Sequence, residues 1–159
     1  MDRPITGYHL DAAGDWVAEL DCGHGQHVRH DPPFLLRPWT QTQAGRDAMI
    51  GTALACVRCD RLELPEGFEC YKRTSEFDEG SIPPGLRSDH TTGAGVWARI
   101  VVRAGSLRYV IEPPIARELV LDPAHPGTVA PGVPHRVEPI GAVRFQVEFH
   151  RRSLGGGDG

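Results

Sequence analysis

The chain has 159 residues, a formal charge of −4 at pH 7, 40% hydrophobic residues and 24% charged residues. This composition is typical of globular domains, and its 19 Gly and 14 Pro favour short elements joined by turns. The charge argues against nucleic-acid binding, which needs a basic surface. We find no apolar run near the roughly 18 residues that cross a bilayer and no apolar signal core, so we predict a cytoplasmic protein without membrane partners.

The composition changes along the chain, which predicts two domains. Three of the four Cys lie before residue 61, and the later part is richer in Val, Ile, Pro and Gly. We therefore expect a small Cys/His module at residues 1–61, a linker at 62–67 and a second domain at 68–152. The Gly-rich tail at 153–159 is expected to be disordered.

The first sixty residues predict a small β module with one helix. Alternating apolar residues and the turn residues between them indicate a hairpin over 5–21, and residues 26–30 indicate a third strand. Prolines 32, 33 and 38 predict an extended loop. Apolar residues at helical spacing predict one amphipathic helix over 43–56, although two glycines weaken it.

The module has the residues for a structural zinc site. Cys22 and His24 lie at a strand turn, and Cys56 and Cys59 form a Cys-x-x-Cys pair about thirty residues later. Thiolate and imidazole ligands suit zinc, and a closed set of four is structural. His27 is the alternative fourth ligand. A module of about sixty residues buries little apolar surface, so a metal staple is expected to stabilise it.

Two other interpretations of these cysteines remain open. They could be plain buried thiols, or Cys56 and Cys59 could be a redox pair. A thioredoxin-like pair begins a helix after a strand, whereas this pair is predicted to end one.

From residue 68 onward the sequence predicts a β-barrel of the jelly-roll type. Short apolar runs are separated by turn residues, and we expect strands at 68–71, 96–102, 106–111, 118–121, 127–130, 135–139 and 143–150. The predicted fold class is therefore mainly β: a zinc-stapled hairpin and helix followed by a cupin-type barrel.

Two family resemblances accompany these features. Residues 5–61, with Cys22-Gly-His-Gly-Gln-His-Val-Arg-His30 and Cys56-Val-Arg-Cys59, resemble a small bacterial domain family of unknown function. Residues 64–152, with Ser88-Asp-His-Thr-Thr-Gly and Phe145-Gln-Val-Glu-Phe, resemble TehB/YeaR-like small cupins, which are associated with tellurite resistance and with nitrate and nitrosative stress. That resemblance implies His90, His135 and Glu148 as contacts of a second metal, although the His-x-His pair of the general cupin pattern is missing.

These features predict a metal-binding small cupin protein of a bacterial stress response. The second site would hold Zn, Fe or Ni and act on a small molecule or oxyanion, with Arg99 or Arg136 as anion contacts. Catalytic residues are unknown, because only Tyr109, Glu112 and His150 offer a general base, and enzyme activity stays undecided. The alternative is a non-catalytic sensor or adaptor whose zinc module contacts a protein partner. Exposed strand edges also make a homodimer plausible.

Overall fold

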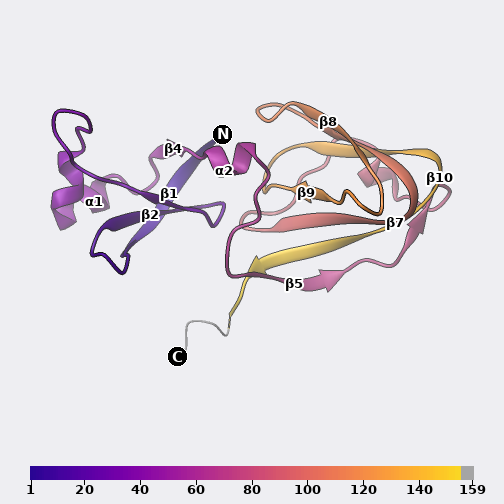
Figure 1. Cartoon of the computed structure of the whole chain (residues 1–159), viewed down its shortest axis with the longest axis horizontal. Coiled ribbons are helices and arrows are strands. Elements are labelled where there is room, and N and C mark those ends of the chain that lie inside the picture. The colour runs from indigo at the N-terminus through magenta and orange to yellow at the C-terminus, as the bar shows by residue number, and fades with distance from the viewer. Residues whose placement is uncertain (155–159) are drawn as a thin grey trace. The chain divides into compact units, whose positions relative to one another are not determined.

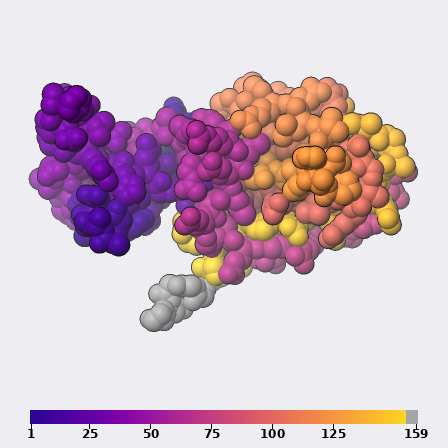
Figure 2. All heavy atoms as spheres, viewed as in Figure 1, coloured from indigo at the N-terminus to yellow at the C-terminus, as the bar shows by residue number. Residues whose placement is uncertain are grey.

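The computed structural model describes residues 1–154, so most of the predicted Gly-rich tail, residues 155–159, lies outside the described residues. The chain divides into two compact units, of which the first is Met1–Arg58 and the second begins at Cys59. The colours of Figures 1 and 2 distinguish them, since the first unit runs from indigo to magenta. Among residues 1–154, no helix has the length and apolar composition needed to cross a bilayer.

The first unit is built on a four-stranded antiparallel sheet with the order β3-β2-β1-β4. Its strands are β1 (Asp2–Leu10), β2 (Trp16–Leu20), β3 (Gly25–His27) and β4 (Ala53–Ala55). Its helical segments are the 3-10 turn η1 (Pro38–Gln41), the helix α1 (Gln43–Ala48) and the start of α2 (Val57–Asp60), within which the division between the units falls.

The predicted hairpin is confirmed as strands β1 and β2. The Asp11 carboxylate accepts hydrogen bonds from the backbone N–H groups of Ala13 and Asp15, each at 2.9 Å, and so fixes the turn between the strands. Ile5 and Leu20, which are paired across the hairpin, are both buried. The third strand also forms, but it is shorter than predicted and ends at His27.

The single helix predicted over 43–56 is wrong. Helix α1 ends at Ala48, and Gly51 has a φ of +87°, a left-handed conformation that turns the chain back. The Gly51 N–H donates to the Ile5 carbonyl and the Ile5 N–H donates to the Thr52 carbonyl, so the following residues join the sheet as β4. Pairing with β1 therefore outweighs the helical pattern of residues 52–56.

The second unit contains a six-stranded antiparallel sheet that curls into a half-barrel (Figure 1), in agreement with the predicted mainly β class. The order β5-β10-β7-β8 forms its path, β6 pairs with β10, and β9 pairs with β7. The strands are β5 (Phe68–Arg73), β6 (Phe77–Asp78), β7 (Trp97–Ile111), β8 (Arg117–Leu121), β9 (Gly127–Val129) and β10 (His135–Arg152). A 3-10 turn, η2 (Pro84–Leu86), precedes β7.

Four of the predicted strands are halves of two long ones. Residues 96–102 and 106–111 belong to β7, and residues 135–139 and 143–150 belong to β10. The predicted turn at Gly105 is instead a bend within a continuous strand, because this residue has a φ of +78° and pairs with Val143 beside a register irregularity of β10. A Cβ at Gly105 would overlap with the carbonyl oxygen of Ala142, so only glycine permits this close approach.

The core of the second unit lies on the concave face of this sheet. Alternate residues of β10, namely Phe145, Val147 and Phe149, face inward together with Ala98 and Ile100 of β7. Phe145 is completely buried, and its ring contacts that of Phe77 with centroids 5.6 Å apart. The intervening residues Gln146 and Glu148 of β10 do not line this face.

Candidate metal centre

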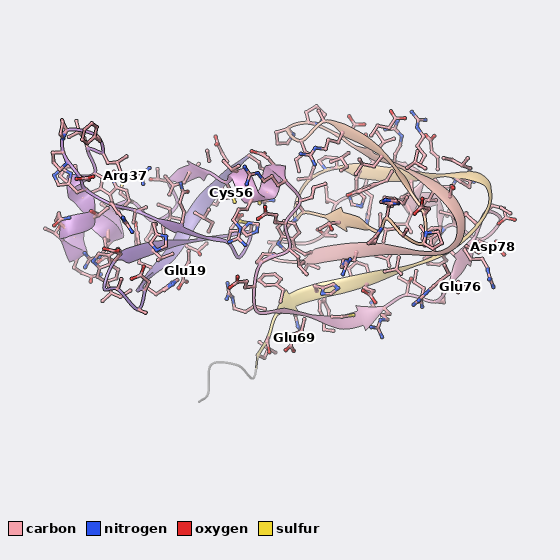
Figure 3. All side chains as sticks on the ribbon, in the orientation of Figure 1. Glu19, Arg37, Cys56, Glu69, Glu76 and Asp78 are labelled. Carbon is pink, nitrogen blue, oxygen red and sulfur yellow. The ribbon has the colours of Figure 1, made fainter. Side chains whose placement is uncertain are left out.

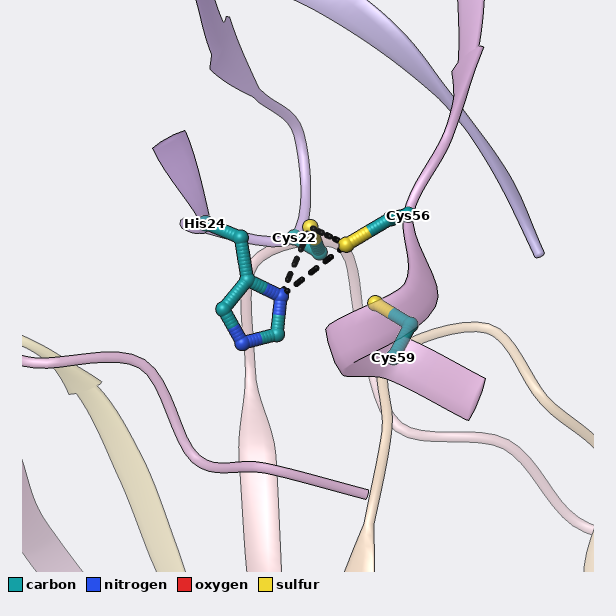
Figure 4. A group of neighbouring side chains, drawn as sticks. All are labelled: Cys22, His24, Cys56 and Cys59. Atoms are coloured by element: carbon teal, nitrogen blue, oxygen red, sulfur yellow. Dashed lines mark hydrogen bonds between the residues drawn. The ribbon is translucent and has the colours of Figure 1, made fainter. Parts of the chain in front are cut away.

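Four metal-binding side chains of the first predicted site meet in the structure (Figure 4). Cys22, His24, Cys56 and Cys59 each offer one donor atom, and the four atoms all lie within 4.8 Å of one another. All four residues are buried. The sequence prediction therefore named the residues that the fold brings together.

Two short turns position these side chains. Cys22 and His24 occupy the turn between β2 and β3, which is closed by bonds from the Gly23 N–H to the Leu20 carbonyl and from the Leu20 N–H to the His24 carbonyl. Cys56, labelled in Figure 3, directly follows β4. Its N–H donates to the Met1 carbonyl at 2.7 Å. One turn of α2 then brings Cys59 beside Cys56, because residues three apart share a helix face.

The distances suit one tetrahedral ion. His24 Nδ1 lies 3.4 Å from Cys22 Sγ and 3.3 Å from Cys56 Sγ, and the two sulfurs are 3.9 Å apart. Around a zinc ion with Zn–S near 2.3 Å and Zn–N near 2.0 Å, neighbouring donors of this set lie about 3.5–3.8 Å apart. Three thiolates and one imidazole form a closed set with no position for water or substrate, so these residues could hold a structural zinc ion.

His27 does not take part in the cluster. Its Nε2 atom lies 2.7 Å from the Asp11 carboxylate, and its side chain is half exposed. The alternation of β3 turns His24 and His27 to different surroundings, and His24 provides the nitrogen donor.

One argument from the sequence is corrected here. The Cys-x-x-Cys pair was predicted to end a helix, but it follows strand β4 and begins α2. That placement is the one expected of a redox pair, so helix position no longer separates the two interpretations. The presence of Cys22 and His24 within reach of both thiols is what favours a metal.

The structure also brings together two residues of the second predicted site. The backbones of His90 and His135 form an isolated bridge with N–H···O distances of 2.9 Å in both directions, and their ring centroids are 5.2 Å apart. His135 Nδ1 lies 3.0 Å from the carbonyl oxygen of Val133, which can only accept, so Nδ1 carries the proton and Nε2 has the free lone pair. Burial lowers the pKa of His135 and outweighs the hydrogen bond to Val133, which raises it.

Both rings line a cavity of about 40 Å³ on the concave face of the sheet. The other lining residues are mostly apolar and include Ile100, Phe145 and Phe149. A second hollow beside it shares His90, Thr92 and Phe149 with the cavity and adds Lys72. The sequence did not single out Lys72, because its place opposite Phe149 depends on the pairing of β5 with β10.

Glu148 does not join the two histidines. Phe145, Val147 and Phe149 line the cavity, so the alternation of β10 turns Glu148 to the opposite face. There it accepts a hydrogen bond of 2.9 Å from Arg73 Nε. Burial alone would raise the pKa of Glu148, but the hydrogen bond and charge of Arg73 outweigh it and hold that pKa below its ordinary value. The predicted set of two histidines and a carboxylate is therefore not assembled.

Two other candidates for chemistry in this unit, Arg136 and Tyr109, already have hydrogen-bond partners, whereas neither ring nitrogen of the buried His150 has one among residues 1–154. Arg136 contacts Glu112, Glu138 and Asp89, which leaves it poorly suited as an anion contact. The Tyr109 hydroxyl donates to the Thr128 carbonyl at 2.8 Å, and burial raises the pKa of this phenol. His150 Nε2 lies 3.6 Å from Glu148.

Comparisons with known proteins agree with this division of the chain. Residues 6–63 match the family model "Protein of unknown function (DUF3565)", and residues 72–147 match the "TehB-like domain". No curated protein shows significant similarity to the chain.

Two solved structures resemble the fold. The crystal structure of TehB from Haemophilus influenzae has a TM-score of 0.51 and 23% identity over 55% of this chain, which spans 32% of the TehB chain. The crystal structure of a protein from E. coli strain K12 has a TM-score of 0.52 and 16% identity, and the match covers 57% of this chain and 97% of that one. At these identities the likeness concerns the fold alone. The chain thus joins a DUF3565 domain to a TehB-like domain.

Proposed function

We propose that this chain is a metal-binding protein of a bacterial stress response, in which a structural zinc ion stabilises the first unit and the TehB-like unit binds a small ligand. The observation that carries the proposal is the group of four buried donors within 4.8 Å of one another. The link to tellurite, nitrate or nitrosative stress rests on the resemblance of residues 64–152 to the TehB/YeaR-like small cupins, and the match of residues 72–147 to the TehB-like domain supports that resemblance.

Zinc is the metal that this donor set favours. Thiolates and an imidazole suit zinc, whereas the cluster has no carboxylate of the kind that Mg²⁺ or Ca²⁺ requires. Without a metal, the three small thiol side chains would stabilise the fold only by packing. With a metal bound, the binding energy adds directly to the free energy of folding. Zinc bound here would act by holding the turn after β2 to the start of α2.

The second site rests on the two histidines without Glu148. The Nε2 lone pair of His135 is fixed by the Val133 carbonyl, and His90 lies beside it at the edge of an apolar cavity. Two imidazoles leave coordination positions open, so a zinc, iron or nickel ion here would keep room for a small molecule or oxyanion. A cavity of about 40 Å³ admits only a ligand of a few non-hydrogen atoms.

Elemental analysis tests the first site. Protein purified without added metal should contain about one zinc per chain, and Cys56→Ser should lose it because a closed set of four ligands is broken. Cys70→Ser is the matched control, since the Cys70 thiol contacts the Lys72 carbonyl outside the cluster. Full zinc content in the Cys56→Ser protein would refute the assignment.

The second site is tested in the same preparations. His135→Ala should abolish binding of an added second metal, while the zinc content of the first site stays constant. Titration with Zn²⁺, Fe²⁺ and Ni²⁺ measures this binding. Glu148→Gln is the control, because Glu148 faces away from the cavity. Equal second-metal binding by the wild-type and His135→Ala proteins would remove this part of the proposal.

One observation favours a second candidate function, a non-catalytic adaptor. The loop after β3 exposes Phe34 at 85% and Leu36 at 71% of their surface, and a bridge between Asp31 and Leu35 fixes its shape. Exposed aromatic and aliphatic side chains on a shaped loop are common in protein contacts. If this function holds, Phe34→Ser with Leu36→Ser should abolish binding of a partner protein without changing the zinc content, and unchanged partner binding would contradict it.

A further inference from the structure

We propose that Cys22 and Cys56 are a site of reversible oxidation: a peroxide converts this pair to a disulfide, and the zinc ion leaves. The inference rests on the proposed zinc site and adds its regulation. It concerns two residues that both belong to the first unit.

The two sulfurs are already neighbours. Cys22 Sγ and Cys56 Sγ are 3.9 Å apart, and they come from the turn after β2 and the residue after β4. A disulfide needs a sulfur separation of about 2.05 Å, so side-chain rotation must close roughly 2 Å. The same imidazole nitrogen, His24 Nδ1, lies 3.4 Å from Cys22 Sγ and 3.3 Å from Cys56 Sγ, as the dashed lines of Figure 4 mark.

Access selects the sulfur that reacts first. Cys22 and Cys59 have no exposed surface, whereas Cys56 retains 5%. A zinc-bound cysteine is held as the thiolate, which is the nucleophilic form, so Cys56 combines reactivity with the greater access. Cys22 is then the resolving residue, because its sulfur contacts that of Cys56 directly.

The reaction balances with hydrogen peroxide as the oxidant. The Cys56 thiolate attacks one peroxide oxygen, the O–O bond breaks, and the departing hydroxide takes a proton to become water. The Cys22 thiolate then attacks the sulfenic acid sulfur of Cys56, the S–S bond forms, and the S–O bond breaks to release a second hydroxide, which is also protonated. The two thiolates lose two electrons and the peroxide gains them.

Loss of the metal follows from the number of ligands. A disulfide sulfur does not bind zinc as a thiolate does, so only His24 and Cys59 remain of the closed set. Two ligands hold zinc far more weakly than four, and the ion dissociates. A dithiol reductant regenerates both thiolates and restores the site.

The experiment uses the full chain with Cys70→Ser, so that only the three cluster thiols can react. Zinc is first counted by elemental analysis, and hydrogen peroxide is then added in the presence of a zinc-sensitive dye. We expect about one zinc released per chain, a loss of 2 Da by intact mass spectrometry and a peptide pair linked through Cys22 and Cys56. Dithiothreitol followed by added zinc should restore the starting metal content.

The outcomes separate the two proposals. Absence of zinc before oxidation refutes the proposed zinc site. If zinc is present, its retention under peroxide refutes the switch, and so does a disulfide between Cys56 and Cys59 in place of Cys22 and Cys56.

Discussion

The two units of this chain obtain their stability from different sources. In the first, the buried apolar side chains of the sheet are few, namely Ile5, Val17, Ala18 and Leu20, and three of the four metal-binding side chains, Cys22, His24 and Cys56, are buried in the same unit. In the second, large side chains such as Phe145, Tyr109 and Leu107 are buried on two strands of 15 and 18 residues. We therefore expect the first unit to depend on the proposed zinc ion, whereas the second depends on packing spread along its sheet.

This difference has a physical reason. A unit of about sixty residues buries a smaller fraction of its surface than a larger one, and its core rarely supplies more than a few kcal/mol of net stability. A metal adds binding energy at a single point, so that stability is lost all at once when one ligand fails. A packed sheet loses stability in proportion to the contacts that a substitution removes.

Removing the metal should have the largest effect and should fall on the first unit alone. We expect a strong chelator to unfold this unit, because apparent binding energies of structural zinc are about 10 kcal/mol or more and exceed the stability of a small core. Amide spectra recorded by nuclear magnetic resonance should lose the dispersed signals of residues 1–58 while those of the TehB-like unit stay in place. If both sets of signals persist, the contrast between the units is wrong.

Phe145→Ala should produce the reverse pattern. Removing a fully buried ring that contacts Phe77 should lower the free energy of unfolding of the second unit by about 3–5 kcal/mol. Urea unfolding followed by circular dichroism measures the loss, and the zinc content should stay at the wild-type value. Phe34→Ala is the control, since this ring is 85% exposed and should change stability little.

Gly105→Ala should have an intermediate effect on the same unit. An alanine at a φ of +78° is strained, and its Cβ would overlap with the Ala142 carbonyl, so we expect a loss of about 2–3 kcal/mol. Gly93→Ala is the control, because a Cβ there meets nothing within 4 Å and its φ is not in the left-handed region. Equal urea midpoints for the two variants would show that the bend in β7 is not constrained by this glycine.

Gly105 also explains why the sequence predicted two strands where the second unit has the single strand β7. The positions of its β residues were largely predictable from apolar alternation and from Pro and Gly punctuation. Whether Gly105 marks a turn or a bend was not, because that depends on the strand that pairs with it. The prediction over 43–56 failed for a related reason: three residues of β4 follow a helical pattern locally but pair with β1, which lies some fifty residues earlier.

The candidate sites show the same limit. The four residues of the metal cluster could be predicted because two closely spaced Cys/His pairs at turns are typical of a zinc site. They are Cys22, His24, Cys56 and Cys59. The choice between His24 and His27 needed the structure, since Asp11 engages His27. For Glu148, the alternation of the strand already placed it opposite Phe145, Val147 and Phe149, and the structure shows which of the two faces lines the cavity.

The smallest expected effect concerns charge on the outer surface of the second unit, which tests whether packing alone accounts for its stability. Glu138 accepts a hydrogen bond of 2.7 Å from Arg108 and one of 3.4 Å from Arg136. These two arginines, Arg108 first, lower the pKa of Glu138 below its ordinary value of 4.5. A carboxylate with a lowered pKa stabilises the folded state above the ordinary value, and this contribution disappears as the pH falls through the lowered pKa.

Glu138→Gln should therefore lower the urea midpoint slightly at pH 7. The difference from wild type should shrink once the pH falls below about 4.5, where the Glu138 carboxylate of the unfolded chain gains a proton, and should vanish below the lowered pKa of the folded state. High salt should also reduce it, because exposed ion pairs are screened. Glu69→Gln is the control, since the structure gives Glu69 no ion pair among residues 1–154. A difference that stays constant from pH 7 to acid would mean that Glu138 acts through packing or neutral hydrogen bonding. The outer surface of this unit would then be stabilised by packing, as its core is, and not by charge.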